Sequence, residues 1–159
     1  MFFYKCMYVD MCRKARIDGK APNAKVLKYD TKQEISIDEL GTISRMYKDR
    51  VDFVVVYIDE IHALDGWSFE QNKFKIKTHR AIEDRLSAAE ILQSLDDFSL
   101  PLIVVDTMKN EANLNHGGLP ERMCVVLDGE VKYIGGIGPY DFNIEEMITY
   151  LEKIVKSPQ

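Results

Sequence analysis

The sequence predicts a single α/β domain, because two apolar strands flank an amphipathic helix. The runs from Val51 to Ile58 and from Leu100 to Thr107 are nearly continuous in apolar, β-branched residues, which is typical of strands covered on both faces. Between them, from Arg80 to Asp96, apolar side chains recur at spacings of four, three and three, which indicates a helix with one buried face. Strand, helix and strand together predict a right-handed parallel crossover.

Local signals predict the elements on either side of this crossover. Residues 23–38 contain two short alternations of apolar and polar residues around residues 30–32, which indicates a small leading hairpin. Downstream, the dipeptide Asp128-Gly129 joins two apolar runs and favours a tight two-residue turn. Asn143, three residues before Glu146, predicts the cap of a closing helix whose apolar positions face inward.

Composition excludes several classes of function. A chain of 159 residues that is 46% hydrophobic is about the size of one domain with its own core. The net charge of -5, with basic residues scattered among acids, provides no stripe for a phosphate backbone, so we expect no nucleic-acid partner. Three cysteines without a CxxC pair or metal-ligand spacing predict neither a disulfide framework nor a metal site. A reducing compartment fits best.

We divide the chain into an N-terminal segment, residues 1–16, and one domain, residues 17–159. Ten of the first twelve residues are apolar, but Lys5 and Asp10 interrupt them and the stretch is shorter than the ~20 residues of a spanning helix. Basic residues follow this stretch rather than precede it, unlike in a secretory signal. The segment could be the remnant of an anchor, an interfacial patch or a stretch without a role, and the chain as written is expected in the cytoplasm.

An unusual cluster of ionisable residues follows the first apolar run. The stretch "YIDEIHALDGW", Tyr57 to Trp67, holds Asp59, Glu60 and His62 close to the carboxyl end of the predicted strand. Open α/β sheets place their sites at this edge. Taken alone, the acids would be solvated strand-end residues and His62 a surface histidine.

This motif and several others, in the same order and at compatible spacing, resemble the iodothyronine deiodinases from about Met46 to Ile154. They are "HRAIEDRLSAAEIL", "VVDTMKN", "LPERMCVVLDGEVKYIGGIGP" and "NIEEMITYLEKI". The element order also resembles a thioredoxin-like fold of the peroxiredoxin type. That fold requires a central strand and first helix before Val51, yet only ten residues, "GTISRMYKDR", separate the leading hairpin from it. A strand, a loop and a helix need about 25 residues or more, so the central strand and most of the first helix are expected to be missing.

The resemblance implies the reductive removal of iodine from thyroxine-type iodothyronines or other halogenated phenols. Its nucleophile is a selenocysteine in a "GSCT-selenocysteine-PPF" loop, which is absent between Leu40 and Ser44. A selenolate attacks the polarisable iodine, thiols supply the electrons, and no bound cofactor or metal is implied. His62 would stabilise the anion or relay a proton, and Glu60 would orient its imidazole and fix its tautomer.

Further roles also come from the resemblance alone. His79 matches a histidine that recognises the phenolic ring, and the residues Asp65, Gly66 and Trp67 would turn the chain away from the sheet. Pro120 matches a proline that thioredoxin folds often hold in cis, although trans is the default for any single proline. Family members are membrane-anchored homodimers.

Two positions depart from the family pattern. Ile137 stands where one subtype has a phenolate-binding arginine, and no thiol precedes the second apolar run. Cys124 falls inside a predicted strand, where a small core residue is the simpler interpretation.

Three hypotheses follow. In the first, the chain is a genuine deiodinase relative whose nucleophile segment was lost in conceptual translation, because a gene model that reads its UGA codon as stop splices around it. In the second, it is an inactive truncated isoform or pseudoenzyme that binds ligand or dimerises. The third, a thiol reductant using Cys124, has the weakest support.

Overall fold

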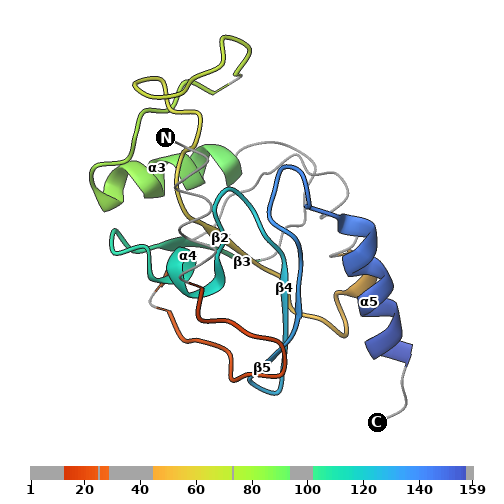
Figure 1. Cartoon of the computed structure of the whole chain (residues 1–159). Coiled ribbons are helices and arrows are strands. Elements are labelled where there is room, and N and C mark those ends of the chain that lie inside the picture. The colour runs from red at the N-terminus through yellow and green to blue at the C-terminus, as the bar shows by residue number, and fades with distance from the viewer. Residues whose placement is uncertain (1–12, 25, 29–44, 73, 94–101, 157–159) are drawn as a thin grey trace.

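The computed structural model describes residues 13–24, 26–28, 45–72, 74–93 and 102–156, and these residues form two separate small sheets (Figure 1). One sheet has the strand order β1-β3-β2, with bounds Val26–Lys28, Leu102–Asp106 and Val54–Tyr57 respectively. The other is a hairpin of β4, Cys124–Leu127, and β5, Glu130–Ile134. The mixed helices and strands confirm the α/β class.

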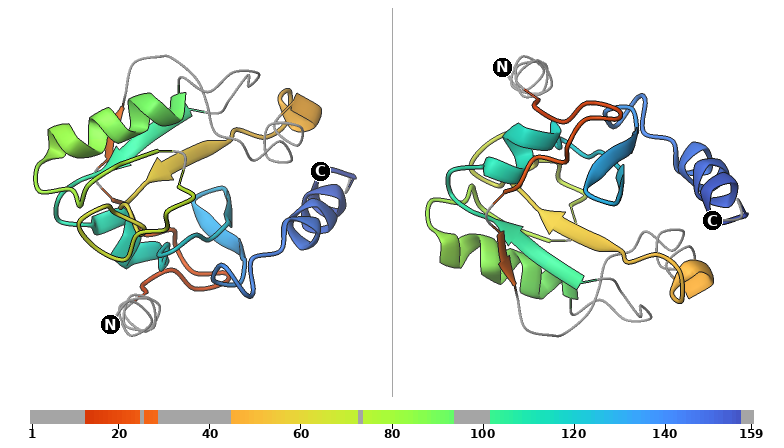
Figure 2. Two further views of the ribbon diagram at one scale, coloured as in Figure 1. Left: turned by 90° about the horizontal axis from the view of Figure 1, so that it is seen from above. Right: turned by 90° about the horizontal axis from the view of Figure 1, so that it is seen from below.

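The predicted parallel crossover is present. Strand β2 runs parallel to β3, with Val54 opposite Leu102 and Tyr57 opposite Val105, and α3, Ile82–Gln93, connects them. The apolar side chains of α3 pack on the buried residues of β3, as its spacing predicts. A short helix that the sequence pattern did not reveal, α4 (Glu111–His116), lies on the opposite face of this sheet from α3 (Figure 2).

The crossover elements are shorter than predicted for local reasons. The N–H of Val51 donates to the carbonyl of Tyr47, in the helical turn at residues 45–47, so β2 begins only at Val54. Helix α3 begins at Ile82 because Asp84 Oδ2 accepts the backbone N–H groups of Arg80 and Ala81 at 2.8 and 2.9 Å, which caps its first turn. The predicted end of this helix lies outside the described residues.

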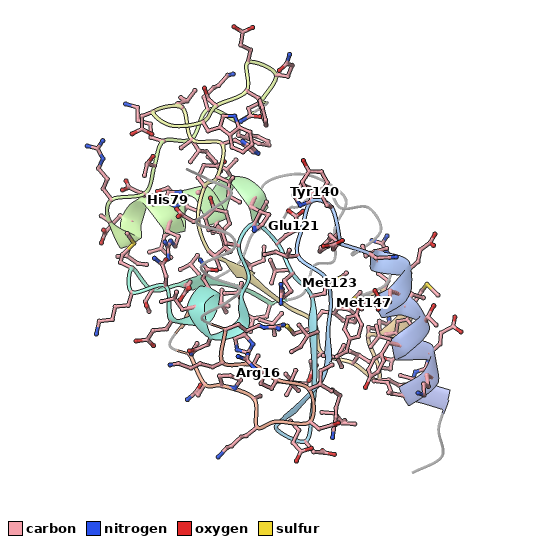
Figure 3. All side chains as sticks on the ribbon, viewed as in Figure 1. Arg16, His79, Glu121, Met123, Tyr140 and Met147 are labelled. Carbon is pink, nitrogen blue, oxygen red and sulfur yellow. The ribbon has the colours of Figure 1, made fainter. Side chains whose placement is uncertain are left out.

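The hairpin and the last helix form the second half of the molecule. Asp128 and Gly129 both have positive φ, 52° and 79°, as the predicted tight turn requires. The N–H of Glu146 donates to Asn143 Oδ1 at 3.1 Å, which confirms the cap of α5, Ile144–Lys156. In Figure 3 Met123 and Met147 lie between hairpin and helix, and they belong to one apolar cluster with Tyr133 and Leu151.

Strand β1 pairs antiparallel with β3. The rest of the predicted leading hairpin, including residues 30–32, lies outside the described residues, as do residues 1–12 and the junction from Leu40 to Ser44. No helix in the described part of the chain is both long and apolar enough to cross a membrane.

The two sheets do not join. Within the described residues, β2 pairs with β3 on one side only, and β4 pairs with β5. In the described part of the chain, β2 and β4 therefore do not pair with each other.

Candidate active site

The acidic and imidazole groups lie in a turn directly after β2. Asp59 Oδ1 accepts the backbone N–H of Glu60, and Glu60 Oε1 accepts the backbone N–H of His62, both at 3.1 Å. Side-chain acceptors thus replace the ladder partners that the backbone loses where the strand ends. All three residues are half-buried.

The imidazole of His62 is held by a contact that the sequence did not predict. Its Nδ1 lies 3.1 Å from the backbone oxygen of Trp67, and its ring lies 4.9 Å from the Trp67 ring and 4.3 Å from that of Phe69. Glu60 Oε1 accepts the backbone N–H of the same histidine, and a direct contact of Glu60 with the imidazole stays a prediction. The Trp67 carbonyl is thus one group that orients the imidazole.

Asp65 fastens the base of the loop that carries these aromatic rings. Its Oδ1 accepts the N–H of Thr78 at 2.7 Å, and its Oδ2 lies 3.4 Å from Arg80 Nη2. The hydrogen bonds from Thr78, and to a lesser extent the charge of Arg80, lower the pKa of Asp65. Gly66 donates to the carbonyl of Ala63 within the same turn. Residues 64–67 form a turn, and Asp65 closes the loop where the chain returns at Thr78.

His79 lies at the start of the crossover helix, packed against β2 (Figure 3). Its side chain is only 1% exposed; Nδ1 lies 3.6 Å from Asp59 Oδ1, and Nε2 lies 3.4 Å from the Tyr57 hydroxyl. Burial lowers the pKa of His79, although the charge of Asp59 opposes this shift. His79 therefore contacts Asp59 and Tyr57. Its direct contact with a substrate ring stays a prediction.

Tyr57 is a site residue that the sequence pattern did not reveal. It looked like one more apolar position of a buried strand, yet its hydroxyl lies beside His79. Burial, followed by the negative charges of Glu60 and Asp59, raises the pKa of Tyr57, so it remains a neutral phenol. An aromatic residue with a polar tip at a strand end was the available signal.

A cavity of about 240 Å³ adjoins these groups. Three polar side chains border it at the end of β2, while apolar side chains from the loop and from α3 form most of the other walls. Its lining residues are Tyr57, Glu60, His62, Asn72, Phe74, Ile76, Ala88, Ile91 and Leu92. Apolar walls with a few converging polar groups are typical of a small-molecule site.

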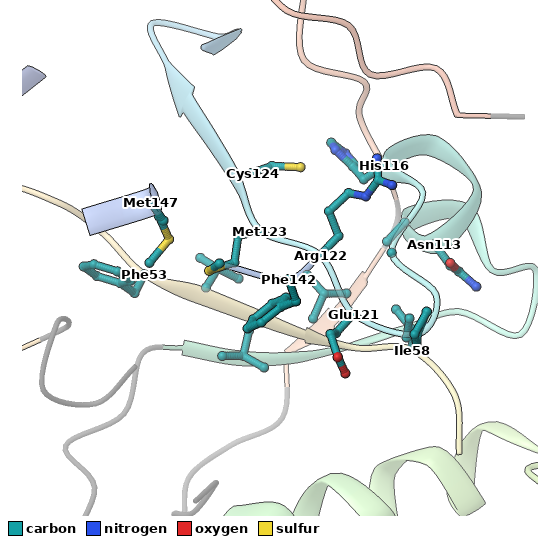
Figure 4. Close-up of a pocket in the computed structure, with 16 residues that line it drawn as sticks. Phe53, Ile58, Asn113, His116, Glu121, Arg122, Met123, Cys124, Phe142 and Met147 are labelled. Atoms are coloured by element: carbon teal, nitrogen blue, oxygen red, sulfur yellow. The ribbon is translucent and has the colours of Figure 1, made fainter. Parts of the chain in front are cut away.

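A second cavity, of about 310 Å³, separates the two sheets (Figure 4). Residues 53–56 and Ile58 border it on the β2 side, and residues 120–124 border it on the β4 side. Pro120 lies in this lining, and the Leu119–Pro120 peptide bond is cis, as the resemblance suggests and the default does not.

Two positions that depart from the family pattern lie near this second cavity. Cys124 lines it, and burial raises the pKa of the thiol, which disfavours the thiolate. Ile137 packs against the buried Leu119 and offers no group that could bind a phenolate. Among the described residues, His, Cys, Asp and Glu side chains form no group of three that could hold a metal ion.

The arrangement defines an α/β protein with acidic and imidazole groups at the carboxyl end of β2. A model of the iodothyronine deiodinase family matches residues 34–155, and the chain belongs to this family. It is 44% identical over 108 residues to a type II iodothyronine deiodinase of Rattus norvegicus, covering 64% of this chain and 40% of the relative. A type I iodothyronine deiodinase of Xenopus laevis is 37% identical over 117 residues, covering 74% and 45% respectively. The chain thus spans less than half the length of these relatives.

Proposed function

We propose that this chain is an iodothyronine deiodinase relative that, in its complete form, removes iodine reductively from thyroxine-type iodothyronines in thyroid hormone metabolism. The observation that carries the proposal is the meeting of Glu60, His62 and Tyr57 at an apolar-walled cavity of about 240 Å³. Such walls suit a halogenated aromatic ring, and the polar groups at one end suit its hydroxyl or the carbon that exchanges iodine for hydrogen.

The chemistry assigns each group a task. A selenolate attacks iodine, a selenium–iodine bond forms, the carbon–iodine bond breaks, and the electron pair remains on the ring carbon. That carbon must take a proton, which protonated His62 can deliver, while two thiols reduce the selenium, release iodide and become a disulfide. His79 would support the site through Tyr57 and Asp59, with a direct contact to the phenolic ring as its further proposed role.

The nucleophile belongs, in this proposal, to a central strand that is missing from the junction between Leu40 and Ser44. The cavity between the sheets supports this, because it borders the β2 side that has no strand partner among the described residues. Val54 is 53% exposed, which is unusual for a strand so rich in valine. A neighbouring strand about 4.8 Å away would cover it and complete a thioredoxin-like sheet.

The alternative proposal is an inactive truncated isoform or pseudoenzyme that keeps the ring-binding cavity. The raised pKa of Cys124 favours this over a thiol reductant, because the thiol that faces the inter-sheet cavity is a poor nucleophile. A homodimer and a membrane anchor are implied by the family and are proposed for the complete protein only.

Sequencing the transcript across the codons for Leu40 to Ser44 separates the two proposals. We expect an in-frame segment with a UGA codon, and we expect protein containing that segment to release iodide from thyroxine in the presence of a dithiol. The 159-residue chain serves as the matched control and should release none. A transcript that joins these codons directly would establish the truncated form, and a complete protein without iodide release would overturn the proposed activity.

A further inference from the structure

We propose that Trp67 and Phe69 are positioning residues that hold the His62 imidazole in the tautomer with its hydrogen on Nδ1. This inference rests on the proposed function, since it names how the proton donor of that site is oriented. Neither aromatic side chain needs to touch the substrate for this role.

The hydrogen bond fixes the tautomer. The His62 Nδ1 atom lies 3.1 Å from the Trp67 backbone oxygen, and a carbonyl oxygen can only accept. Nδ1 must therefore carry the hydrogen, and in the neutral imidazole Nε2 then holds the lone pair. Proton transfer at the site is thereby assigned to Nε2, on the side of the ring away from the loop backbone.

The aromatic rings fix the plane of the imidazole. His62, Trp67 and Phe69 form a three-ring cluster in which the centroids lie 4.3, 4.9 and 5.4 Å apart. Tilted and edge-on arrangements at these distances are the favourable ones for aromatic pairs. The ring of Phe69 thus restrains the plane of the imidazole, and Asp65 closes the loop that carries Trp67 and Phe69.

The three-ring cluster lies at the surface, so we expect it to orient the His62 imidazole and to contribute little to the stability of the fold. Trp67 is 52% exposed and Phe69 is 42% exposed. Their truncation leaves the buried clusters intact, and we expect the Phe69→Ala variant to fold as the unmodified chain does.

His116 provides an internal reference with the opposite assignment. Its Nε2 atom lies 3.1 Å from the carbonyl oxygen of Pro22, so in His116 the hydrogen belongs on Nε2. One chain thus holds two histidines that should show opposite tautomers in the same spectrum.

The test is a long-range proton–nitrogen NMR spectrum of the 15N-labelled chain, assigned with the His62→Gln and His116→Gln variants. We expect a protonated Nδ1 at His62 and a protonated Nε2 at His116. Phe69→Ala should shift His62 toward a mixture of tautomers, while Phe69→Tyr and the surface control Tyr140→Ala, at a residue that is 88% exposed, should not. A neutral His62 with its hydrogen on Nε2, or an unchanged His62 in Phe69→Ala, would overturn the inference.

Activity provides the second readout. In the form with the restored segment, Phe69→Ala should lower kcat roughly tenfold to a hundredfold with little change in KM, because a misplaced reacting group costs that much. The tautomer is read without turnover, so a failed tautomer assignment leaves the proposed deiodination standing. If His62 shows the expected tautomer but the complete protein releases no iodide, the proposed function is overturned and the tautomer assignment stands.

Discussion

The parallel strands β2 and β3 both end in acidic groups at one edge of the sheet, but the two ends differ in what their polar atoms contact. At the end of β3, Asp106 is fully buried, and its two oxygens accept the N–H groups of Ala112 and Asn113 at 3.1 and 2.9 Å. At the end of β2, Glu60 and His62 are half-buried and line a cavity.

The comparison shows how a carboxylate that only stabilises the fold differs from one that is available to a ligand. Both oxygens of Asp106 accept hydrogen bonds from the first turn of α4, and full burial keeps this carboxylate away from any ligand. Buried Arg85 adds to this fixed arrangement by donating to the carbonyl oxygens of Asp106 and Thr107. At the end of β2, polar atoms line a cavity and can reach a ligand, which makes this strand end the candidate site.

The largest expected effect is on chemistry at the end of β2. In the form with the restored segment, His62→Ala should lower kcat for iodide release by about a hundredfold to ten-thousandfold, as loss of a proton-transfer group does. Circular dichroism should show an unchanged fold, since His62 is a half-buried loop residue. Turnover equal to that of the unmodified protein would remove His62 from the mechanism.

The second effect is on stability at the end of β3. Asp106→Ala removes a charged acceptor from two buried N–H groups, and we expect a loss of about 3 kcal/mol in the free energy of unfolding. Glu60→Ala, the matched change at the end of β2, should cost less, about 1 kcal/mol, because the hydrogen bonds of Glu60 to the His62 backbone and the Tyr57 side chain are only half-buried. Urea denaturation of both variants measures this, and equal losses would erase the distinction between the two strand ends.

A third prediction compares one valine in β3 with one valine in β2. Val105 is fully buried in β3, whereas Val54 in β2 is 53% exposed. Val105→Ala should cost about 2 kcal/mol, from two lost methyl groups and the space they leave. Val54→Ala should stay within about 0.5 kcal/mol in the 159-residue chain. With the restored segment the cost at Val54 should rise, and a cost that does not change would argue against a strand beside β2.

The smallest effect is the pH dependence that comes from His79. Because burial lowers the pKa of His79, the unfolded chain binds a proton more readily than the folded chain once pH falls below about 6.5. Stability is therefore lost as pH falls from 6.5 toward the folded-state pKa, and above 6.5 this contribution is flat.

The His79→Gln variant tests this assignment. Unfolding free energies measured between pH 7 and pH 5 should fall less steeply in this variant than in the unmodified chain. Asp65 and Asp84, whose pKa values are lowered by backbone hydrogen bonds, act only at more acidic pH. An unchanged slope in His79→Gln would contradict the assignment.

The features that the sequence predicted correctly are those set by nearby residues. The crossover follows from apolar periodicity, the hairpin from the pair Asp128-Gly129, and the start of α5 from Asn143. The family was readable from several motifs in the same order, and the position of Glu60 and His62 after a strand was readable from one of them.

The features that were missed depend on contacts that no local pattern encodes. Tyr57 and His79 meet across 22 positions, and the hydrogen bond between His62 and the Trp67 carbonyl involves a backbone atom that every residue type provides. Helix α4 is only six residues long and is held by Asp106, so it has no hydrophobic period of its own. Contacts of this kind appear only once the chain is folded.

The side of β2 that has no strand partner among the described residues also bears on how much of this protein a cell can maintain. A valine-rich strand with an open edge is a template for pairing between copies, and no proline interrupts Val54–Tyr57. We expect the 159-residue chain to self-associate as its concentration rises and to be a client of chaperones and proteases. The central strand proposed above would thus matter for abundance as well as for catalysis.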